Sequence, residues 1–97
     1  MTGTARSSEG LDARRRRALV RAWRRGTREM DLVLGRYADA HIADLSDHDL
    51  ADFEALMDVP DQDLFAWVTG AAPVAPRHAS PVLDAIVTFH TRRHDTT

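Results

Sequence analysis

Apolar residues in this 97-residue chain recur three and four positions apart, the spacing that gathers them on one face of an α-helix. The pattern predicts a first helix within residues 11–25 and a second over residues 28–41. Between them, Gly26 suits the left-handed conformation that ends a helix, and Thr27 suits the cap of the next one. The expected buried stripes are Leu19, Ala22 and Trp23 in the first helix and Met30, Val33, Leu34, Tyr37 and Ala38 in the second.

The same spacing, with typical boundary residues, predicts three further helices. Ser46 is the expected cap of the third helix, and Asp61 is the expected cap of a fourth that stops at Gly70. Ser80 followed by Pro81 is a typical start for the fifth. The expected stripes are Leu50, Phe53, Leu56 and Met57 in the third, Leu64, Phe65, Trp67 and Val68 in the fourth, and Val82, Leu83, Ile86, Val87 and Phe89 in the fifth.

No segment sustains the alternation of apolar and polar residues that is typical of a β-strand. We therefore expect an all-α fold, a compact bundle of about five short helices that forms a single domain over residues 11–93. Residues 1–10 have little to bury and are expected to form a disordered tail, and residues 94–97 a frayed end. Gly35 falls inside the second predicted helix, where glycine costs about 1 kcal/mol relative to alanine.

Charge is distributed unevenly, although the net charge is only −2 and all 13 basic residues are arginines. Residues 1–36 hold ten arginines and four acids, for a net charge of +6, whereas residues 37–97 have a net charge of −8. The run Arg14–Arg17 suggests one alternative function, an arginine-rich helical nucleic-acid-binding module. An antitoxin-like regulatory module is a further alternative, for which the sequence identifies no toxin partner. The arginines of the first helix spread around its exposed faces, however, which favours a solvated helix or a docking surface for an acidic protein over nucleic acid.

Composition and spacing also exclude several classes of site. The chain has no cysteine, so disulfides, thiolate nucleophiles and thiolate metal ligands are excluded. His90 and His94 lie one helical turn apart, but no further ligand completes a known spacing, and we predict no metal site. A bundle of this size offers hardly any cleft for paired catalytic carboxylates. No apolar run approaches the roughly 20 residues of a membrane span, and no secretory stretch opens the sequence, so we expect a cytoplasmic protein.

The segment Arg25-Gly26-Thr27-Arg28-Glu29 joins the first two predicted helices and places opposite charges beside a residue without a side chain. In a structural interpretation, Gly26 ends the helix and Arg25 pairs with Glu29 at the surface, a contact worth less than about 1 kcal/mol. In a functional interpretation, Gly26 lets another molecule approach the backbone closely, while Arg25 and Glu29 supply a donor and an acceptor. The spacing alone favours neither.

Several sequence motifs occur one after another between residues 25 and 67. R-G-x-x-E is matched by Arg25, Gly26 and Glu29, and an overlapping R-E-x-D by Arg28, Glu29 and Asp31. L-S, F-x-x-L-L and D-x-D-L-F-x-W are matched further along by Leu45-Ser46, by Phe53 with Leu56-Met57, and by residues 61–67. Met57 stands where the F-x-x-L-L motif usually has its second leucine. Over residues 18–92, the chain resembles the FAD assembly factors of succinate dehydrogenase, the SdhE type.

The resemblance implies a non-enzymatic assembly chaperone. From the residues themselves we expect a monomer before docking, because no excess of exposed apolar residues is evident, and a protein that neither binds nucleic acid nor inserts into a membrane. The partner that the resemblance implies is the flavoprotein subunit of succinate dehydrogenase, and the flavoprotein subunit of fumarate reductase is a further candidate. The chaperone would promote covalent attachment of FAD to a histidine of the flavoprotein subunit. The chain lacks a glycine-rich phosphate loop, so we expect it to bind no FAD stably itself. The implied partner-binding residues are Arg25, Gly26, Arg28, Glu29 and Asp31, whereas Asp61, Asp63, Phe65 and Trp67 are expected to build and cap the fourth helix.

Overall fold

The computed structural model describes residues 10–95, which form five α-helices and two short 3-10 helices and contain no strand. The elements are α1 (Ala13–Ala22), α2 (Arg28–His41), η1 (Ile42–Asp44), α3 (Asp47–Leu56), α4 (Asp61–Thr69), η2 (Pro76–His78) and α5 (Pro81–Asp95). The predicted all-α fold of five short helices is confirmed. The expected tail over residues 1–10 and frayed end over residues 94–97 lie outside the described residues, except for Gly10 and the last residues of α5.

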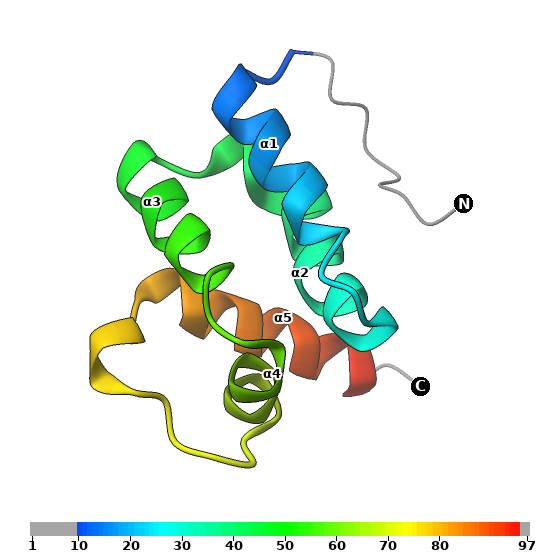
Figure 1. The fold of residues 1–97 in the computed structure, drawn as a ribbon, viewed down its shortest axis with the longest axis vertical. Helices are drawn as coiled ribbons and strands as arrows, with labels where there is room; N and C mark the ends of the chain where they lie inside the picture. The colour runs from blue at the N-terminus through cyan, green and yellow to red at the C-terminus, as the bar shows by residue number, and fades with distance from the viewer. Residues whose placement is uncertain (1–9, 96–97) are drawn as a thin grey trace.

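The helices pack around one apolar core, in which α1 lies along α2 and α5 contacts α2, α3 and α4 (Figure 1). All the residues of the stripes predicted for the second and third helices are buried. From α5, the core receives Val82, Leu83 and Ile86, while Val87 and Phe89 are partly buried against it. Each large apolar side chain buried in this way contributes about 1.5–3 kcal/mol, so the core holds the motif-bearing loop between α1 and α2 on a stable scaffold.

Helix α1 is shorter at both ends than the predicted segment of residues 11–25. It begins at Ala13 because the side chain of Asp12 accepts a hydrogen bond from the Arg15 amide and caps the first turn. It ends at Ala22, and the amide of Arg25 donates to a side chain of α2 instead of continuing the helix. The segment that follows α1 is therefore a true loop between two helices.

Local boundary signals explain most of the other helix ends. The hydroxyls of Ser46 and Ser80 each accept a hydrogen bond from the amide three residues on, and Gly70 ends α4 with a φ of +80°. The prediction that Asp61 caps α4 is wrong. The preceding proline occupies the cap position without a side-chain bond, and Asp61 is the first residue of the helix, with its carboxylate bonded to Arg25.

Gly35 owes its place in α2 to the indole ring of Trp23. A Cβ atom at Gly35 would lie 2.4 Å from the nearest ring carbon of Trp23, much closer than real atoms approach. The ring is held in this position because its Nε1 donates to the Asp39 carboxylate at 3.0 Å. The absence of a side chain at Gly35 thus allows α1 and α2 to pack closely at the end that leads into the loop.

The stripe predicted for α4 is wrong at Phe65. Leu64 and Val68 are buried, and Trp67 packs partly buried against the core, but Phe65 is 36% exposed. A helix of nine residues buries one face, and Phe65 lies outside it.

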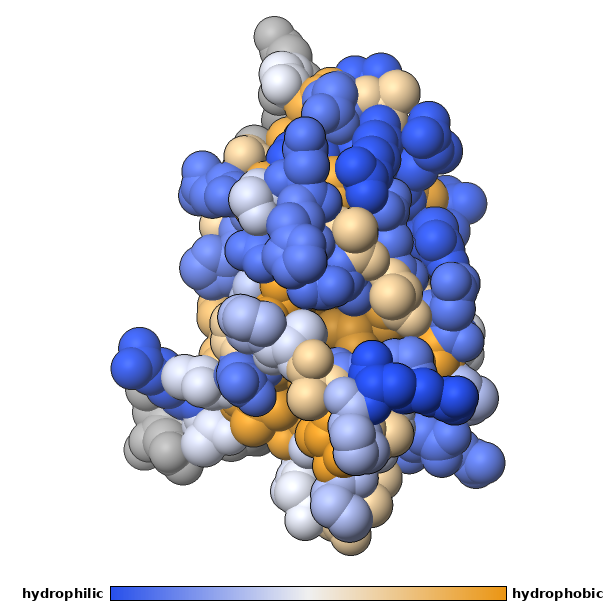
Figure 2. All heavy atoms as spheres, turned by 90° about the vertical axis from the view of Figure 1, so that its left-hand side faces the viewer, coloured by the Kyte–Doolittle hydropathy of each residue, from blue (hydrophilic) through white to orange (hydrophobic). Residues whose placement is uncertain are grey.

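The face drawn in Figure 2 is hydrophilic over its upper half, with apolar side chains visible between polar ones lower down. Among the described helices, none combines the length and the apolar character that crossing a membrane requires.

Candidate docking site

Arg25, in the loop between α1 and α2, is bonded to the turn between α3 and α4. Its Nε donates to Asp61 Oδ1 at 2.8 Å, its Nη2 donates to the Val59 carbonyl at 2.6 Å, and its Nη1 donates to the Met57 carbonyl. The side chain is only 10% exposed. The surface pair of Arg25 with Glu29, which belonged to one of the two interpretations of this segment, is therefore not formed, and the guanidinium is already occupied within the chain.

The shape of the loop is fixed from the other side by α2. Asp31 Oδ1 accepts the backbone N–H of Arg25 at 2.7 Å, and the hydroxyl of Thr27 accepts the amide three residues on, which confirms Thr27 as the cap. Gly26 has a φ of +103°, the left-handed region expected for it, although it does not end α1, which stops at Ala22. A Cβ at Gly26 would meet nothing within 4 Å, so the space beside this backbone is open.

The first turn of α2 presents two opposite charges to solvent. Arg28 and Glu29 are both exposed, and neither side chain makes a hydrogen bond or ion pair within the part of the chain that the structure describes. They differ in this from Arg25 and Asp31, which turn inward. Of the five predicted partner-binding residues, Gly26, Arg28 and Glu29 therefore face outward together.

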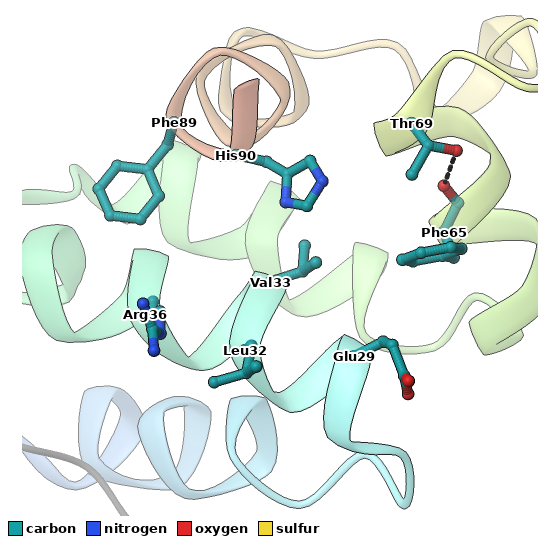
Figure 3. A pocket seen from close by; sticks show the side chains of 8 residues that line it. All are labelled: Glu29, Leu32, Val33, Arg36, Phe65, Thr69, Phe89 and His90. Atoms are coloured by element: carbon teal, nitrogen blue, oxygen red, sulfur yellow. Dashed lines mark hydrogen bonds between the residues drawn. The ribbon is translucent and has the colours of Figure 1, made fainter. Parts of the chain in front are cut away.

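Two grooves flank this first turn of α2. The α2–α4–α5 groove, of about 490 Å³, is lined on one side by Glu29, Leu32, Val33 and Arg36. Its other side consists of Phe65 and Thr69 from α4 and Phe89 and His90 from α5 (Figure 3).

The second, the α1–α2 groove, has about 620 Å³ and runs from Trp23 past Gly26 and Arg28 to Leu32. Leu32 lines both grooves, so the outward charges of the first turn lie on a ridge between two hollows.

Sequence reasoning missed the α2–α4–α5 groove. A signal for it exists in α4, where four large apolar residues occupy positions 64, 65, 67 and 68, more than one face of a helix can bury. The surplus residue, Phe65, is the one that lines the groove. Which surplus residue is exposed depends on how α4 packs against α5, and local sequence does not encode that.

The arginines at the start of α1 are bonded within the chain. Arg14 holds the Glu54 carboxylate through its Nη2, at 2.7 Å, and its Nε, and this hydrogen bonding lowers the pKa of Glu54 and raises that of Arg14. Arg15 donates to the carbonyls of Ile42 and Leu45 at 3.2 and 2.5 Å. These arginines fasten α1 to η1 and α3.

No group of three His, Asp or Glu side chains among the described residues is arranged to hold a metal ion. The side chain of His94 lies outside the described part, so its spacing to His90 stays a prediction. Burial raises the pKa of Tyr37, but its ring lies in the core between Phe53 and Phe89, away from the loop.

Comparison with known proteins agrees with the sequence motifs. Residues 16–90 match a family described as the flavinator of succinate dehydrogenase. The chain is 35% identical over 81 residues to the FAD assembly factor SdhE of Acetobacter pasteurianus, covering 84% of this chain and 74% of that protein. It is also 35% identical over 85 residues to a mitochondrial succinate dehydrogenase assembly factor 2 of Yarrowia lipolytica, covering 84% of this chain and 59% of the relative. No solved structure matches.

Proposed function

This chain belongs to the family of succinate dehydrogenase flavinators, the assembly factors for FAD attachment, and we propose that it binds the flavoprotein subunit of succinate dehydrogenase and promotes covalent attachment of FAD there. The observation that carries the proposal is the first turn of α2. It presents Arg28 and Glu29 to solvent without partners in the described chain, beside the open backbone of Gly26. The Yarrowia lipolytica relative is longer, and the chain spans about 59% of its length.

The five motif residues divide into two roles in this proposal. Gly26, Arg28 and Glu29 contact the flavoprotein subunit: the glycine admits its backbone, and the two charges bond complementary groups on it. Arg25 and Asp31 are positioning residues, because their side chains are bonded within the chain and hold the loop in shape. From the resemblance, all five residues were expected to contact the partner. The bonds that Arg25 and Asp31 make within the chain support the division into two roles instead.

The chain acts by holding its partner and supplies no catalytic group. Formation of a bond between a histidine of the flavoprotein subunit and the flavin requires the two reacting atoms to be held close and aligned. A rigid protein that binds one arrangement of the subunit more tightly than others raises the population of that arrangement. The proposed chaperone therefore contributes binding energy, binds no FAD stably, and leaves the chemistry to the subunit and its flavin.

Co-expression with the flavoprotein subunit tests the function directly, with covalent flavin read as fluorescence in a denaturing gel. Wild-type chain should raise the covalent flavin well above the level without it. Glu29→Ala should lower flavinylation about tenfold or more, since a lost charge-assisted hydrogen bond costs roughly 1.5–3 kcal/mol. Because Glu29 is exposed, the thermal unfolding of the variant should match wild type. A variant that supports full flavinylation would remove Glu29 from the interface.

A matched pair of glycine variants separates docking from backbone strain. Gly26 and Gly70 both have positive φ and open space where a Cβ atom would lie, so alanine at either site costs about 1–2 kcal/mol of folding stability. Only Gly26 lies in the proposed interface. We expect both variants to melt at similar, lowered temperatures and only Gly26→Ala to lose flavinylation. An equal loss of flavinylation in the two variants would mean that Gly26 acts only through the conformation of the backbone.

The remaining expectations belong to the same proposal. The flavoprotein subunit of fumarate reductase is the second candidate partner, and the co-expression assay with that subunit tests it. We propose that the chain is cytoplasmic. We also propose that it is monomeric before docking, and size-exclusion chromatography at several concentrations checks its oligomeric state. Binding of duplex DNA or RNA with a steep salt dependence would instead favour the nucleic-acid alternative. The bonds that Arg14 and Arg15 make within the chain weigh against it.

A further inference from the structure

The α2–α4–α5 groove lies directly beside the proposed contact residue Glu29. Four residues on one face of α2 form its long side, with Glu29 at one end and Arg36 at the other (Figure 3). Glu29 and Arg36 lie seven positions apart, so their backbones are about 10 Å apart along the helix axis. Between them the groove is mostly apolar, with Leu32 and Val33 on the α2 side and Phe65 on the α4 side. It is therefore a hydrophobic slot with a negative end and a positive end.

Phe65 at the rim of this slot is unusual for the molecule. It is 36% exposed, and Val20 is the other large apolar side chain exposed to a comparable degree, at 50%, among the described residues. Val20 lies on α1, outside the α2–α4–α5 groove. An exposed aromatic residue over an apolar floor is the typical anchor of a protein interface, since most binding energy comes from such desolvated contacts.

We propose that the α2–α4–α5 groove binds an apolar segment of the flavoprotein subunit that carries a carboxylate at the Arg36 end and a hydrogen-bond donor at the Glu29 end. The inference rests on the proposed function and deepens it. Glu29 belongs both to the ridge that meets the subunit and to the groove wall, so a partner seated on the ridge continues into the groove. The opposite charges fix the direction of the bound segment.

Binding of the purified flavoprotein subunit to purified variants, measured by titration calorimetry, tests the groove. Phe65→Ser should weaken binding about tenfold or more, and the matched variant Val20→Ser should bind like wild type. Arg36→Glu should weaken binding several-fold by repelling the carboxylate, whereas Arg36→Lys should retain most of the affinity. Because Phe65 and Val20 are exposed, thermal unfolding of the two serine variants should stay close to wild type.

The outcomes distinguish the groove from the function as a whole. If Phe65→Ser and Arg36→Glu bind like wild type while Glu29→Ala binds poorly, the groove inference is overturned and the proposed function stands. If Phe65→Ser alters self-association of the chain and leaves binding to the subunit unchanged, a second copy is the occupant and the inference is likewise overturned. If the wild-type chain itself does not bind the subunit, both fall together.

Discussion

Helix α1 and the first turn of α2 use charge in opposite ways. Arg14 of α1 bonds the Glu54 carboxylate of α3, and Arg15 donates to the carbonyls of Ile42 and Leu45. Arg28 and Glu29 of α2 make no such bonds within the described chain. Arg14 and Arg15 are thus structural, whereas Arg28 and Glu29 are available to a partner. Charge density along a sequence is a poor guide to binding unless the charges are known to be unoccupied.

Arg25 lies between these two regions in the chain and belongs with the inward-bonded arginines. The largest effect we predict is the loss of stability on Arg25→Ala, by about 2–3 kcal/mol. The change leaves the Asp61 carboxylate and two carbonyls without their donor in a nearly buried position. Urea unfolding followed by circular dichroism measures the difference in free energy of unfolding.

The matched control for Arg25→Ala is Arg21→Ala on α1. Arg21 also bonds the α3–α4 turn, through Asp58 at 2.9 Å, but both side chains are well exposed. Such pairs contribute at most about 1 kcal/mol, so Arg21→Ala should unfold nearly like wild type. Equal destabilisation by the two variants would break the distinction between a buried positioning arginine and an exposed one.

Gly35→Ala gives the next largest effect and tests how α1 holds α2. Helix propensity alone predicts stabilisation by about 1 kcal/mol, whereas the contact with Trp23 predicts destabilisation by about 1–3 kcal/mol, because a Cβ would collide with the ring. Urea unfolding decides between the signs. In a Trp23→Ala background the collision is gone, so the same alanine should become neutral or stabilising. Stabilisation in the wild-type background would contradict the packing argument.

Features that depend on neighbouring residues could be predicted from the sequence. The caps at Thr27, Ser46 and Ser80 follow from hydrogen bonds that span three residues, and positive φ at Gly70 follows from the needs of a helix end. The buried stripes of α2 and α3 follow from helical periodicity. These features determine the fold class and place the R-G-x-x-E motif where the α1–α2 loop meets the first turn of α2.

What the sequence could not predict depends on contacts between distant segments. Arg25 meets Asp61 across 36 residues, so neither the bond nor the failure of Asp61 as a cap is visible in local spacing. The collision that makes Gly35 necessary likewise requires the position of Trp23 on another helix. The candidate site was therefore located by its motif, but the split between inward and outward residues required the structure.

The smallest effect we predict is the pH dependence of the bond between Arg14 and Glu54, which belongs to the inward-bonded region. Hydrogen bonding to Arg14 lowers the pKa of Glu54 below its ordinary value of 4.5. The contribution of Glu54 to stability is therefore complete above about pH 4.5 and is lost as the pH falls through the lowered pKa. Wild type should exceed Glu54→Gln in free energy of unfolding near neutral pH, and the difference should shrink in acid. A difference that stayed constant with pH would mean that the Glu54 side chain stabilises the fold without its charge.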